Sequence, residues 1–404
     1  MRILYSFGIH VYGILIFIAS LFYDKARELY RGQRNALKVL REKIDSQSSY
    51  VWFHAASLGE FEQGRPIIEK LKKEHPETKI LLTFYSPSGY NVRKNYSCVD
   101  VVSYLPLDTR KAAQEFLKIV KPTKAIFIKY EFWPNFLLEM EAEKIPVYCI
   151  SAIFRPNQIF FKKYGKWYLQ LLNTFSHIFV QDNLSAKLLN EHGIQKVTVC
   201  GDTRFDRVYA LSLEPKKIPL IESFARNSKV IVAGSTWPED EELLIRYIKL
   251  HPQIKLILVP HEIDKSHLYD IFKLLEGKYI RYTEATEINI HTFNCLVVDA
   301  IGFLSSIYQY GKVAYVGGGF GAGIHNILEA AVWNIPVVFG PNYQKFREAH
   351  ELIAEGGAFS ISDYDSLEKK FDELLDDEEA GKRAGAYILK NVGATEKIYH
   401  LIFS

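Results

Sequence analysis

The alternation of short apolar runs with longer amphipathic stretches is the feature that most limits how this 404-residue chain can fold. The apolar runs are rich in Val, Ile, Phe and Tyr, and the stretches between them have helical spacing. This order predicts βαβ units, in which crossover helices join parallel strands. In the first half we expect strands at 50–54, 80–84, 101–104, 125–128, 147–150, 177–180 and 197–200, and helices such as 61–74 and 109–120.

The pattern restarts after a polar, proline-containing stretch at 211–229. Further strands are expected at 230–233, 255–259, 295–298, 313–316 and 337–339, and a charged helix pair at 365–377 and 379–401 closes the chain. A chain of this length fits two domains of ordinary size, and the last helix could return to the first. Two doubly wound domains facing each other would place a ligand cleft between the carboxyl ends of both sheets.

The first 22 residues contain an uncharged apolar stretch, 3–22, long enough to span about 30 Å as a helix. A cleaved signal peptide, a buried core helix and a membrane anchor all fit this pattern. Lys25, Arg27, Arg31 and Arg34 follow where a signal peptide would have a small-residue cleavage site. We favour an anchor that spans the membrane or lies in its interface, with these basic residues on the cytoplasmic side.

Composition excludes several classes of function. Hydrophobic residues make up 48% and charged residues 24%, as in ordinary globular proteins, and 50 Lys and Arg against 47 Asp and Glu leave a net charge of +3. The first 44 residues hold eight basic and three acidic residues, so no basic surface for nucleic acid is expected elsewhere. Cys98, Cys149, Cys200 and Cys295 form no CxxC pair, which argues against a disulfide framework or a zinc module.

Three motifs in the first half follow predicted strands. The first is His-Ala-Ala-Ser-Leu-Gly-Glu at 54–60, where Glu60 stands near a helix start that favours its ionised, basic form. The others are Glu-Phe-Trp-Pro-Asn at 131–135 and Gly-Asp-Thr-Arg-Phe-Asp at 201–206, which contribute Glu131 and Arg204. Each motif by itself also fits a purely structural role. The first could be a helix start with an acidic first turn, the second a loop with a salt-bridged acid, and the third a linker with an Arg–Asp ion pair.

Three motifs in the second half also follow strands. Gly-Ser-Thr-Trp-Pro-Glu-Asp at 234–240 predicts a capping box between Thr236 and Glu239, at a helix N-terminus that could hold phosphate. Pro-His occupies 260–261. A glycine-rich run at 316–323 precedes His325, and Glu329 is expected on the same helix face. The next predicted strand lacks a terminal acid and no G-K-[ST] occurs, which excludes an NAD fingerprint and a P-loop.

Together and in this order, the six motifs resemble those of the 3-deoxy-D-manno-octulosonic acid (Kdo) transferases of lipopolysaccharide biosynthesis. The family patterns H-A-x-S-x-G-E, E-x-W-P-N, G-S-T-W and V-G-G…H-N-x-x-E are met at 54–60, 131–135, 234–237 and 316–329. The resemblance implies an α/β protein of GT-B type, with two doubly wound Rossmann-like domains. It further implies a hydrophobic membrane anchor at 1–24, an acceptor-binding domain at 25–208 and a CMP-Kdo-binding domain at 209–404.

The implied reaction is an inverting transfer of Kdo from CMP-Kdo to a lipid A precursor (lipid IVA), on the cytoplasmic face of the inner membrane. Glu60 would be the general base, and Glu131 and Arg204 would stabilise the transition state. The implied donor-binding residues are Ser235, Thr236, Pro260, His261, Gly302, Phe303, Gly318, Gly319, His325, Asn326, Ile327, Leu328 and Glu329. The expected acceptor-binding residues are Ser57, Gly59, Arg155, Lys162 and Lys163.

The expected partners are therefore CMP-Kdo, a lipid A precursor and inner-membrane lipid, with no nucleic acid, no cofactor and no essential metal. In the segment 151–168, basic residues interleave with Phe160, Phe161 and Trp167, which suits an interface of phosphate and acyl chain. An ordinary amphipathic helix with a solvated basic face fits the same segment.

The chain departs from the family pattern at a few positions. His261 stands where the family commonly has Arg, Phe303 where it has an acid, Arg204 where it has Lys, and Ile324 where it has Gly. Two other functions therefore stay open. One is a GT-B enzyme that uses a UDP-sugar, as a transferase or an epimerase. The other is a catalytically degenerate, membrane-bound scaffold.

Overall fold

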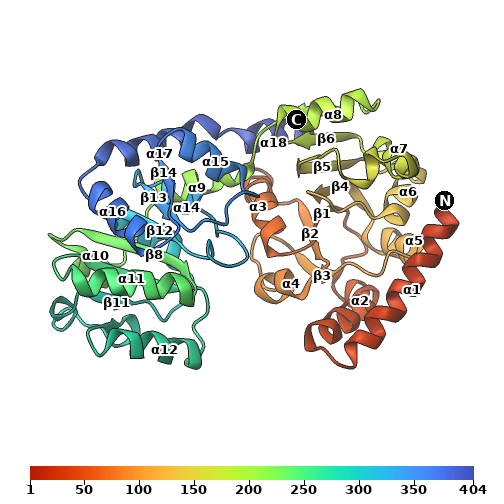
Figure 1. Ribbon diagram of the computed structural model, residues 1–404. Helices are drawn as coiled ribbons and strands as arrows, with labels where there is room; N and C mark the ends of the chain where they lie inside the picture. The colour runs from red at the N-terminus through yellow and green to blue at the C-terminus, as the bar shows by residue number, and fades with distance from the viewer. The chain divides into compact units, whose positions relative to one another are not determined.

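The computed structural model describes residues 1–404, which divide into two compact units, each built on its own sheet (Figure 1). Unit 1 comprises residues 1–206 and 393–404, and unit 2 comprises residues 207–392. Helix α9 (Thr203–Leu213) carries the chain from unit 1 into unit 2. The two parallel α/β sheets predicted from the alternating pattern are both present.

Unit 1 contains a seven-stranded, fully parallel sheet with the order β3-β2-β1-β4-β5-β6-β7. Its strands are β1 (Tyr50–Ala55), β2 (Lys79–Phe84), β3 (Val101–Tyr104), β4 (Pro122–Ile128), β5 (Val147–Ala152), β6 (His177–Val180) and β7 (Val197–Val199). Side chains of β1 alternate between the two faces, so Trp52 joins one hydrophobic cluster and Phe53 the other. A sheet buried on both faces in this way needs helices on both sides.

The helices of unit 1 supply those covers. They are α1 (Arg2–Ser20), α2 (Asp24–Lys43), α3 (Leu58–Glu74), α4 (Pro87–Arg93), α5 (Arg110–Val120), α6 (Pro134–Ala142), α7 (Lys166–Leu171), α8 (Asn183–Glu191) and α18 (Ala394–Phe403). Phe116 of α5 and Phe136 of α6 pack around Trp52 on one face, while Phe61 of α3 and Ile398 of α18 lie on the other.

Unit 2 repeats this plan with the strand order β10-β11-β9-β8-β12-β13-β14. Its strands are β8 (Val230–Thr236), β9 (Lys255–Pro260), β10 (Ile280–Arg281), β11 (Cys295–Val297), β12 (Val313–Val316), β13 (Val337–Phe339) and β14 (Ala358–Ser360). Its helices are α10 (Pro219–Ala225), α11 (Pro238–Leu250), α12 (Lys265–Leu275), α13 (Leu304–Ile307), α14 (Leu328–Ala331), α15 (Arg347–Ala354), α16 (Tyr364–Leu374) and α17 (Glu378–Asn391).

The direction of winding reverses once in each sheet, between β1 and β4 in unit 1 and between β8 and β12 in unit 2. Open α/β sheets bind ligands at the carboxyl ends of the strands beside such a switch point. All four strands run directly into predicted motifs, which begin at His54, Glu131, Gly234 and Gly317 respectively. The topology thus selects these motifs as candidate sites independently of any resemblance.

Two details of the sequence-based prediction are wrong. The edge strands β10 and β14 were not predicted, because β10 has only two residues and β14 (Ala-Phe-Ser) has only one large apolar residue. The predicted helix 379–401 is two helices, α17 and α18. They are separated at Gly393, whose φ of 112° breaks the helix. Asp206 fixes this break by accepting hydrogen bonds from the backbone N–H groups of Gly393 (2.6 Å) and Thr395 (3.0 Å).

Helix α1 lies against unit 1 with one face and leaves the other exposed (Figure 1). Ile9, Ile16 and Ser20 are buried, whereas Ile3 and Phe7 on the opposite face are largely exposed. By length and composition the helix could cross a membrane. The interpretation of this helix as a buried core helix is wrong, because most of its apolar side chains are exposed.

Candidate active site

A chain of hydrogen bonds crosses the carboxyl edge of the unit 1 sheet. Trp52 Nε1 donates to Thr83 Oγ1 (2.8 Å), which lies 2.9 Å from His54 Nδ1. On its other side, His54 Nε2 lies 3.1 Å from Glu131 Oε2. Trp133 Nε1 donates to the same carboxylate oxygen over 2.9 Å. The network therefore connects the buried strands β1 and β2 with the loop that follows β4.

The network fixes how His54 orients Glu131. Trp133 Nε1 lies 3.1 Å from His54 Nε2 as well as 2.9 Å from Glu131 Oε2, so the indole, the imidazole and the carboxylate form one contact. On the other side of the ring, His54 Nδ1 lies within reach of both the hydroxyl (2.9 Å) and the backbone oxygen (3.1 Å) of Thr83, which fixes the ring in place. His54 is fully buried, while the Glu131 side chain keeps 13% of its surface exposed. Glu131 is thus held by hydrogen bonds at the sheet edge, within reach of a ligand.

Glu60 lies in the first turn of α3, directly after the loop that leaves β1. Its carboxylate accepts a hydrogen bond from the Ser57 hydroxyl, at the N-cap position of the same helix. Glu60 is half-buried and Gly59 beside it is exposed, so the carboxylate has open space around it. The N-terminal end of a helix favours negative charge, which suits a carboxylate that must accept a proton.

Arg204 also belongs to this edge of unit 1, in the first turn of α9. Its guanidinium group pairs with Asp202, with Nε at 2.8 Å and a terminal nitrogen at 2.7 Å from Oδ2. Asp202 is almost completely buried, so the pair holds the arginine in a defined orientation.

The predicted acceptor segment differs from a continuous amphipathic helix. Lys162 lies between two short 3₁₀ turns, η1 (Ile159–Phe161) and η2 (Lys163–Gly165), and α7 follows. Phe160 packs into the core and Phe161 packs partly against it, so these two rings present no exposed aromatic face. Lys163 and Arg155 remain exposed. The basic side chains of the predicted acceptor segment are therefore accessible, whereas Phe160 and Phe161 pack into the protein.

In unit 2 the corresponding edge is organised by two buried acids. Asp240 accepts hydrogen bonds from the backbone N–H groups of Gly318 (2.9 Å) and Trp237 (3.0 Å) and from the Tyr315 hydroxyl (2.7 Å). Burial raises the pKa of Asp240, and these three donors oppose the shift. Its neighbour Glu241 accepts hydrogen bonds from Thr236 Oγ1 (2.8 Å) and lies 2.9 Å from His267 Nε2.

The capping box predicted between Thr236 and Glu239 is therefore wrong. Thr236 is the last residue of β8 and its hydroxyl donates to Glu241, while Trp237 occupies the N-cap position and Asp240 accepts from its backbone. The preceding residue, Ser235, has φ of 53°, where β8 loses register with β9. This local twist turns the chain out of the sheet and brings Trp237 to its edge.

Trp237 forms an aromatic cluster with two histidines. The ring of His261 stacks on Trp237 at 4.9 Å and on His325 at 4.4 Å. Trp237 Nε1 donates to His325 Nε2 over 3.1 Å, which leaves the proton of a neutral His325 on Nδ1. Burial, and secondarily the charge of His261, lowers the pKa of His325 to about 4. His325 is therefore a neutral hydrogen-bond donor at physiological pH.

The glycine-rich run allows its backbone to pass very close to the backbone at Gly340. A Cβ at Gly319 would lie 2.6 Å from the backbone nitrogen of Gly340, and Gly318 has φ of 90°. His325 and Asn326 precede the four-residue helix α14, for which Ile327 is the N-cap, so the predicted shared helix face with Glu329 is wrong. Asn326 instead bonds Glu329 directly, with Nδ2 3.0 Å from Oε1, and accepts from the backbone of Leu328.

The remaining predicted donor residues lie on the same edge of unit 2. Pro260 ends β9, so His261 follows the strand immediately. Gly302 has φ of 94° in the turn before α13, and Phe303 is the N-cap of that helix, with its ring 5.6 Å from Tyr282. Sequence reasoning did not assign a role to Thr83, Trp52 or Asp240. They lie within ordinary strand and helix patterns, and only their contacts reveal their role.

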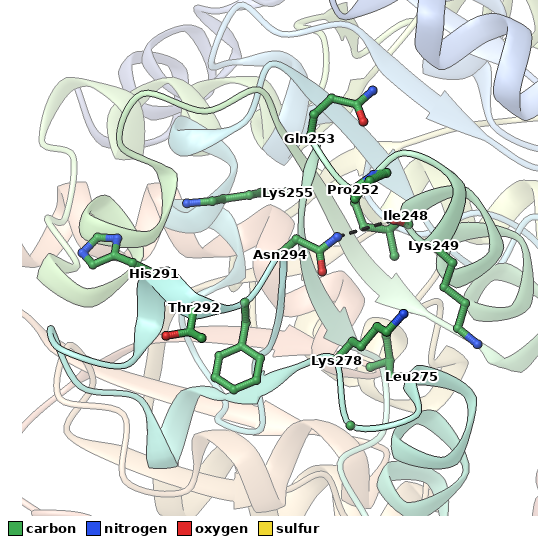
Figure 2. A pocket seen from close by; sticks show the side chains of 12 residues that line it. Ile248, Lys249, Pro252, Gln253, Lys255, Leu275, Lys278, His291, Thr292 and Asn294 are labelled. Atoms are coloured by element: carbon green, nitrogen blue, oxygen red, sulfur yellow. Dashed lines mark hydrogen bonds between the residues drawn. The ribbon is translucent and has the colours of Figure 1, made fainter.

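A separate cavity of about 480 Å³ opens at the opposite edge of the unit 2 sheet (Figure 2). Lys255 at the start of β9, His291 and Asn294 before β11 line it, and Asn294 Nδ2 donates to the backbone oxygen of Ile248 (3.5 Å). None of the six motifs contributes to this cavity. The chain contains no group of three or more His, Cys, Asp or Glu side chains suited to hold a metal ion, and metal independence stays a prediction.

Similarity to known proteins identifies the family. A family profile described as 3-deoxy-D-manno-octulosonic-acid transferase (kdotransferase) matches residues 31–207. A 3-deoxy-D-manno-octulosonic acid transferase from Aquifex aeolicus is 30% identical over 342 residues, covering 83% of this chain and 88% of the relative. The chain belongs to the Kdo transferase family. Kdo transferases from Rickettsia bellii (27% identity, 91% of this chain, 88% of the relative) and Haemophilus influenzae (26%, 87% and 86%) are also similar.

Solved structures agree on the fold of this Kdo transferase family member. A putative UDP-N-acetylglucosamine 2-epimerase from Listeria monocytogenes gives a TM-score of 0.61 at 14% identity, covering 88% of this chain and 96% of that one. MurG from Acinetobacter baumannii gives 0.55 at 12% identity, with coverages of 88% and 99%. At such low identity these likenesses concern the fold alone, and they support the predicted GT-B class.

Proposed function

We propose that this protein transfers Kdo from CMP-Kdo to a lipid A precursor in lipopolysaccharide biosynthesis. Membership of the Kdo transferase family supports the glycosyltransferase activity. The observation that carries the proposal is the arrangement at the unit 1 switch point, where Glu60 and Glu131 follow β1 and β4. Each carboxylate is oriented by a side-chain donor, and each retains access to a ligand.

In this proposal Glu60 is the general base that accepts the proton of the attacking acceptor hydroxyl. The reaction forms a bond between that oxygen and the reacting carbon of Kdo while the bond to the CMP phosphate breaks. Positive charge develops on the sugar, which an anionic Glu131 can stabilise, and negative charge develops on the phosphate, which Arg204 can stabilise. Ser57 orients Glu60, and His54 with Trp133 orients Glu131.

The CMP part of the donor is proposed to bind at the carboxyl edge of unit 2. The neutral His325 presents Nδ1–H, and the backbone of the Gly318 loop is held by Asp240. His261 lies stacked on both Trp237 and His325, where the family commonly carries an arginine. We further propose that transfer needs no metal held by the protein, because no three His, Cys, Asp or Glu side chains group together to hold one.

The membrane association proposed for the protein follows from α1. One face of this helix packs along unit 1 and the other is apolar and exposed, which suits a helix lying in the membrane interface. A groove of about 290 Å³, lined by Leu4, Tyr5, Trp167 and neighbouring residues, opens beside it and suits an acyl chain. The basic residues of α2 would face anionic headgroups, which places the body at the cytoplasmic face of the inner membrane.

The test is a transfer assay on the detergent-solubilised protein. CMP-Kdo and a tetra-acylated lipid A precursor are incubated with the protein in the presence of a chelator, and the lipid is followed by mass spectrometry. We expect its mass to increase by one or more Kdo units. An unchanged lipid mass with intact CMP binding would overturn the acceptor assignment.

The same assay separates the two other functions. A UDP-sugar enzyme would be inhibited by UDP and not by CMP, whereas we expect inhibition by CMP. A degenerate scaffold would bind CMP and release no product from CMP-Kdo with any acceptor. Charge reversal of Lys162 and Lys163 should weaken acceptor use more than donor binding, because these lysines lie on unit 1.

A further inference from the structure

Helix α1 makes polar contacts that an apolar anchor does not need. Arg2, Tyr5 and Tyr12 recur at helical spacing along α1, with Tyr12 at the exposed rim of the packed face, and each bonds a residue elsewhere in unit 1. Polar groups placed against protein cost free energy unless they are hydrogen-bonded, so these pairings specify where the helix docks. The contacts converge on the two sides of one loop, which is the loop that carries Glu131.

The first turn of α1 holds the start of α6, directly after that loop. Arg2 Nε donates to Asn135 Oδ1 (3.1 Å), and the Tyr5 hydroxyl donates to Asp108 Oδ2 (2.7 Å). Asp108 is buried and accepts hydrogen bonds from the backbone N–H groups of Asn135 (3.1 Å) and Phe136 (3.0 Å). Asp108 therefore fixes the residues that follow the Glu131 loop, and Tyr5 of α1 in turn holds Asp108.

Two turns later, Tyr12 reaches the other side of the loop. Its hydroxyl group bonds the hydroxyl of Tyr85, whose ring stacks on Trp133 with 5.1 Å between centroids and 26° between planes. Trp133 in turn donates to Glu131 Oε2 (2.9 Å). The series Tyr12, Tyr85, Trp133 and Glu131 is thus continuous from the membrane-facing helix to the carboxylate.

We infer that α1 is a positioning element for the transfer reaction, in which Tyr12 and Tyr85 set the place of Glu131 through Trp133. The inference rests on the proposed function, because it assigns Glu131 a part in transfer. The helix then has two separable faces. Its outer face, with Ile3 and Phe7, contacts lipid, and its inner face supports the catalytic loop.

The test compares variants of the two faces in the detergent-solubilised full chain. Tyr12→Phe and Tyr85→Phe each remove one hydroxyl group and thereby the same hydrogen bond, and both keep the Tyr85 ring on Trp133. Each should lower kcat about three- to tenfold with little change in the KM for CMP-Kdo, and the double variant should match the single ones. Phe7→Ser, on the outer face, should weaken binding to phosphatidylglycerol vesicles and leave kcat in detergent unchanged.

A second readout does not need turnover. In protein labelled with ¹⁵N-tryptophan, the indole N–H resonance of Trp133, assigned with Trp133→Phe, reports its hydrogen bonds to Glu131 and His54. It should shift in Tyr12→Phe and Tyr85→Phe and not in Phe7→Ser. Unchanged kcat together with an unchanged Trp133 resonance in both tyrosine variants would overturn the inference. Absence of transfer by the unsubstituted protein would instead overturn the proposed function, while the resonance would still show whether α1 holds the loop.

Discussion

The carboxyl edges of the two sheets place acidic side chains in opposite environments. In unit 1, Glu60 and Glu131 are oriented by side-chain donors and still reach solvent. In unit 2, Asp240 and Glu241 are each only 1% exposed and bond backbone and side-chain donors of the surrounding loops. The same edge of the same fold therefore holds accessible carboxylates in one unit and buried carboxylates in the other. Burial, and not residue type, separates the two environments.

The largest effect expected from this contrast is on turnover in unit 1. Glu60→Ala should lower kcat by about 10²–10⁴, because it removes the proposed general base for the acceptor hydroxyl. CMP affinity and thermal stability should stay close to those of the unsubstituted protein. Steady-state kinetics with calorimetry would check this, with the exposed Glu77→Ala as a matched control. Normal turnover in Glu60→Ala would remove Glu60 from this role.

The converse effect is expected in unit 2, on stability. Asp240→Ala would leave the N–H groups of Gly318 and Trp237 and the Tyr315 hydroxyl without their acceptor, at a cost of about 3 kcal/mol. Urea denaturation followed by tryptophan fluorescence would measure the loss. Glu60→Ala should show no comparable loss in the same experiment. Equal stability losses in both variants would remove the distinction between the two edges.

The hydrogen-bond chain behind Glu131 predicts a smaller effect on turnover. Thr83→Val keeps the side-chain volume but removes the hydroxyl between Trp52 and His54, and should lower kcat about tenfold. Thr83→Ser retains the hydroxyl and should restore most of the activity. If Thr83→Val and Thr83→Ser gave the same kcat, the hydroxyl would have no part in orienting His54 and Glu131.

The smallest predicted effect concerns the protonation of the unit 2 histidines. Because the pKa of His325 is lowered to about 4, the folded protein takes up this proton less readily than the unfolded chain does. The contribution of His325 to stability is therefore complete above about pH 6.5 and is lost as the pH falls toward 4. A histidine NMR titration should show His325 neutral at pH 6, and His261→Ala should raise its pKa slightly. A titration near pH 6.5 would contradict this environment.

The sequence predicted the fold and the location of the site edges well, because four strands of strong periodicity end in motifs at the two switch points. It could not predict which acids of the motifs are buried. Asp240 and Glu60 both stand in the first turn of a helix after a strand, and only packing buries Asp240 fully while leaving Glu60 half-buried. The chain Trp52–Thr83–His54 and the pair Tyr12–Tyr85 join residues about 30 and 70 positions apart, so no local pattern reveals them. The uncharged stretch 3–22 likewise gave no sign that Tyr5 and Tyr12 hydrogen-bond other parts of unit 1.

The central claim is that the unit 1 edge performs the chemistry and the unit 2 edge binds the nucleotide. The most direct test is calorimetric titration of CMP into Glu60→Gln and His325→Ala, alongside the unsubstituted protein. We predict that Glu60→Gln binds CMP within about twofold of the unsubstituted affinity and that His325→Ala binds about tenfold more weakly. Loss of CMP affinity in Glu60→Gln with normal binding by His325→Ala would contradict the account.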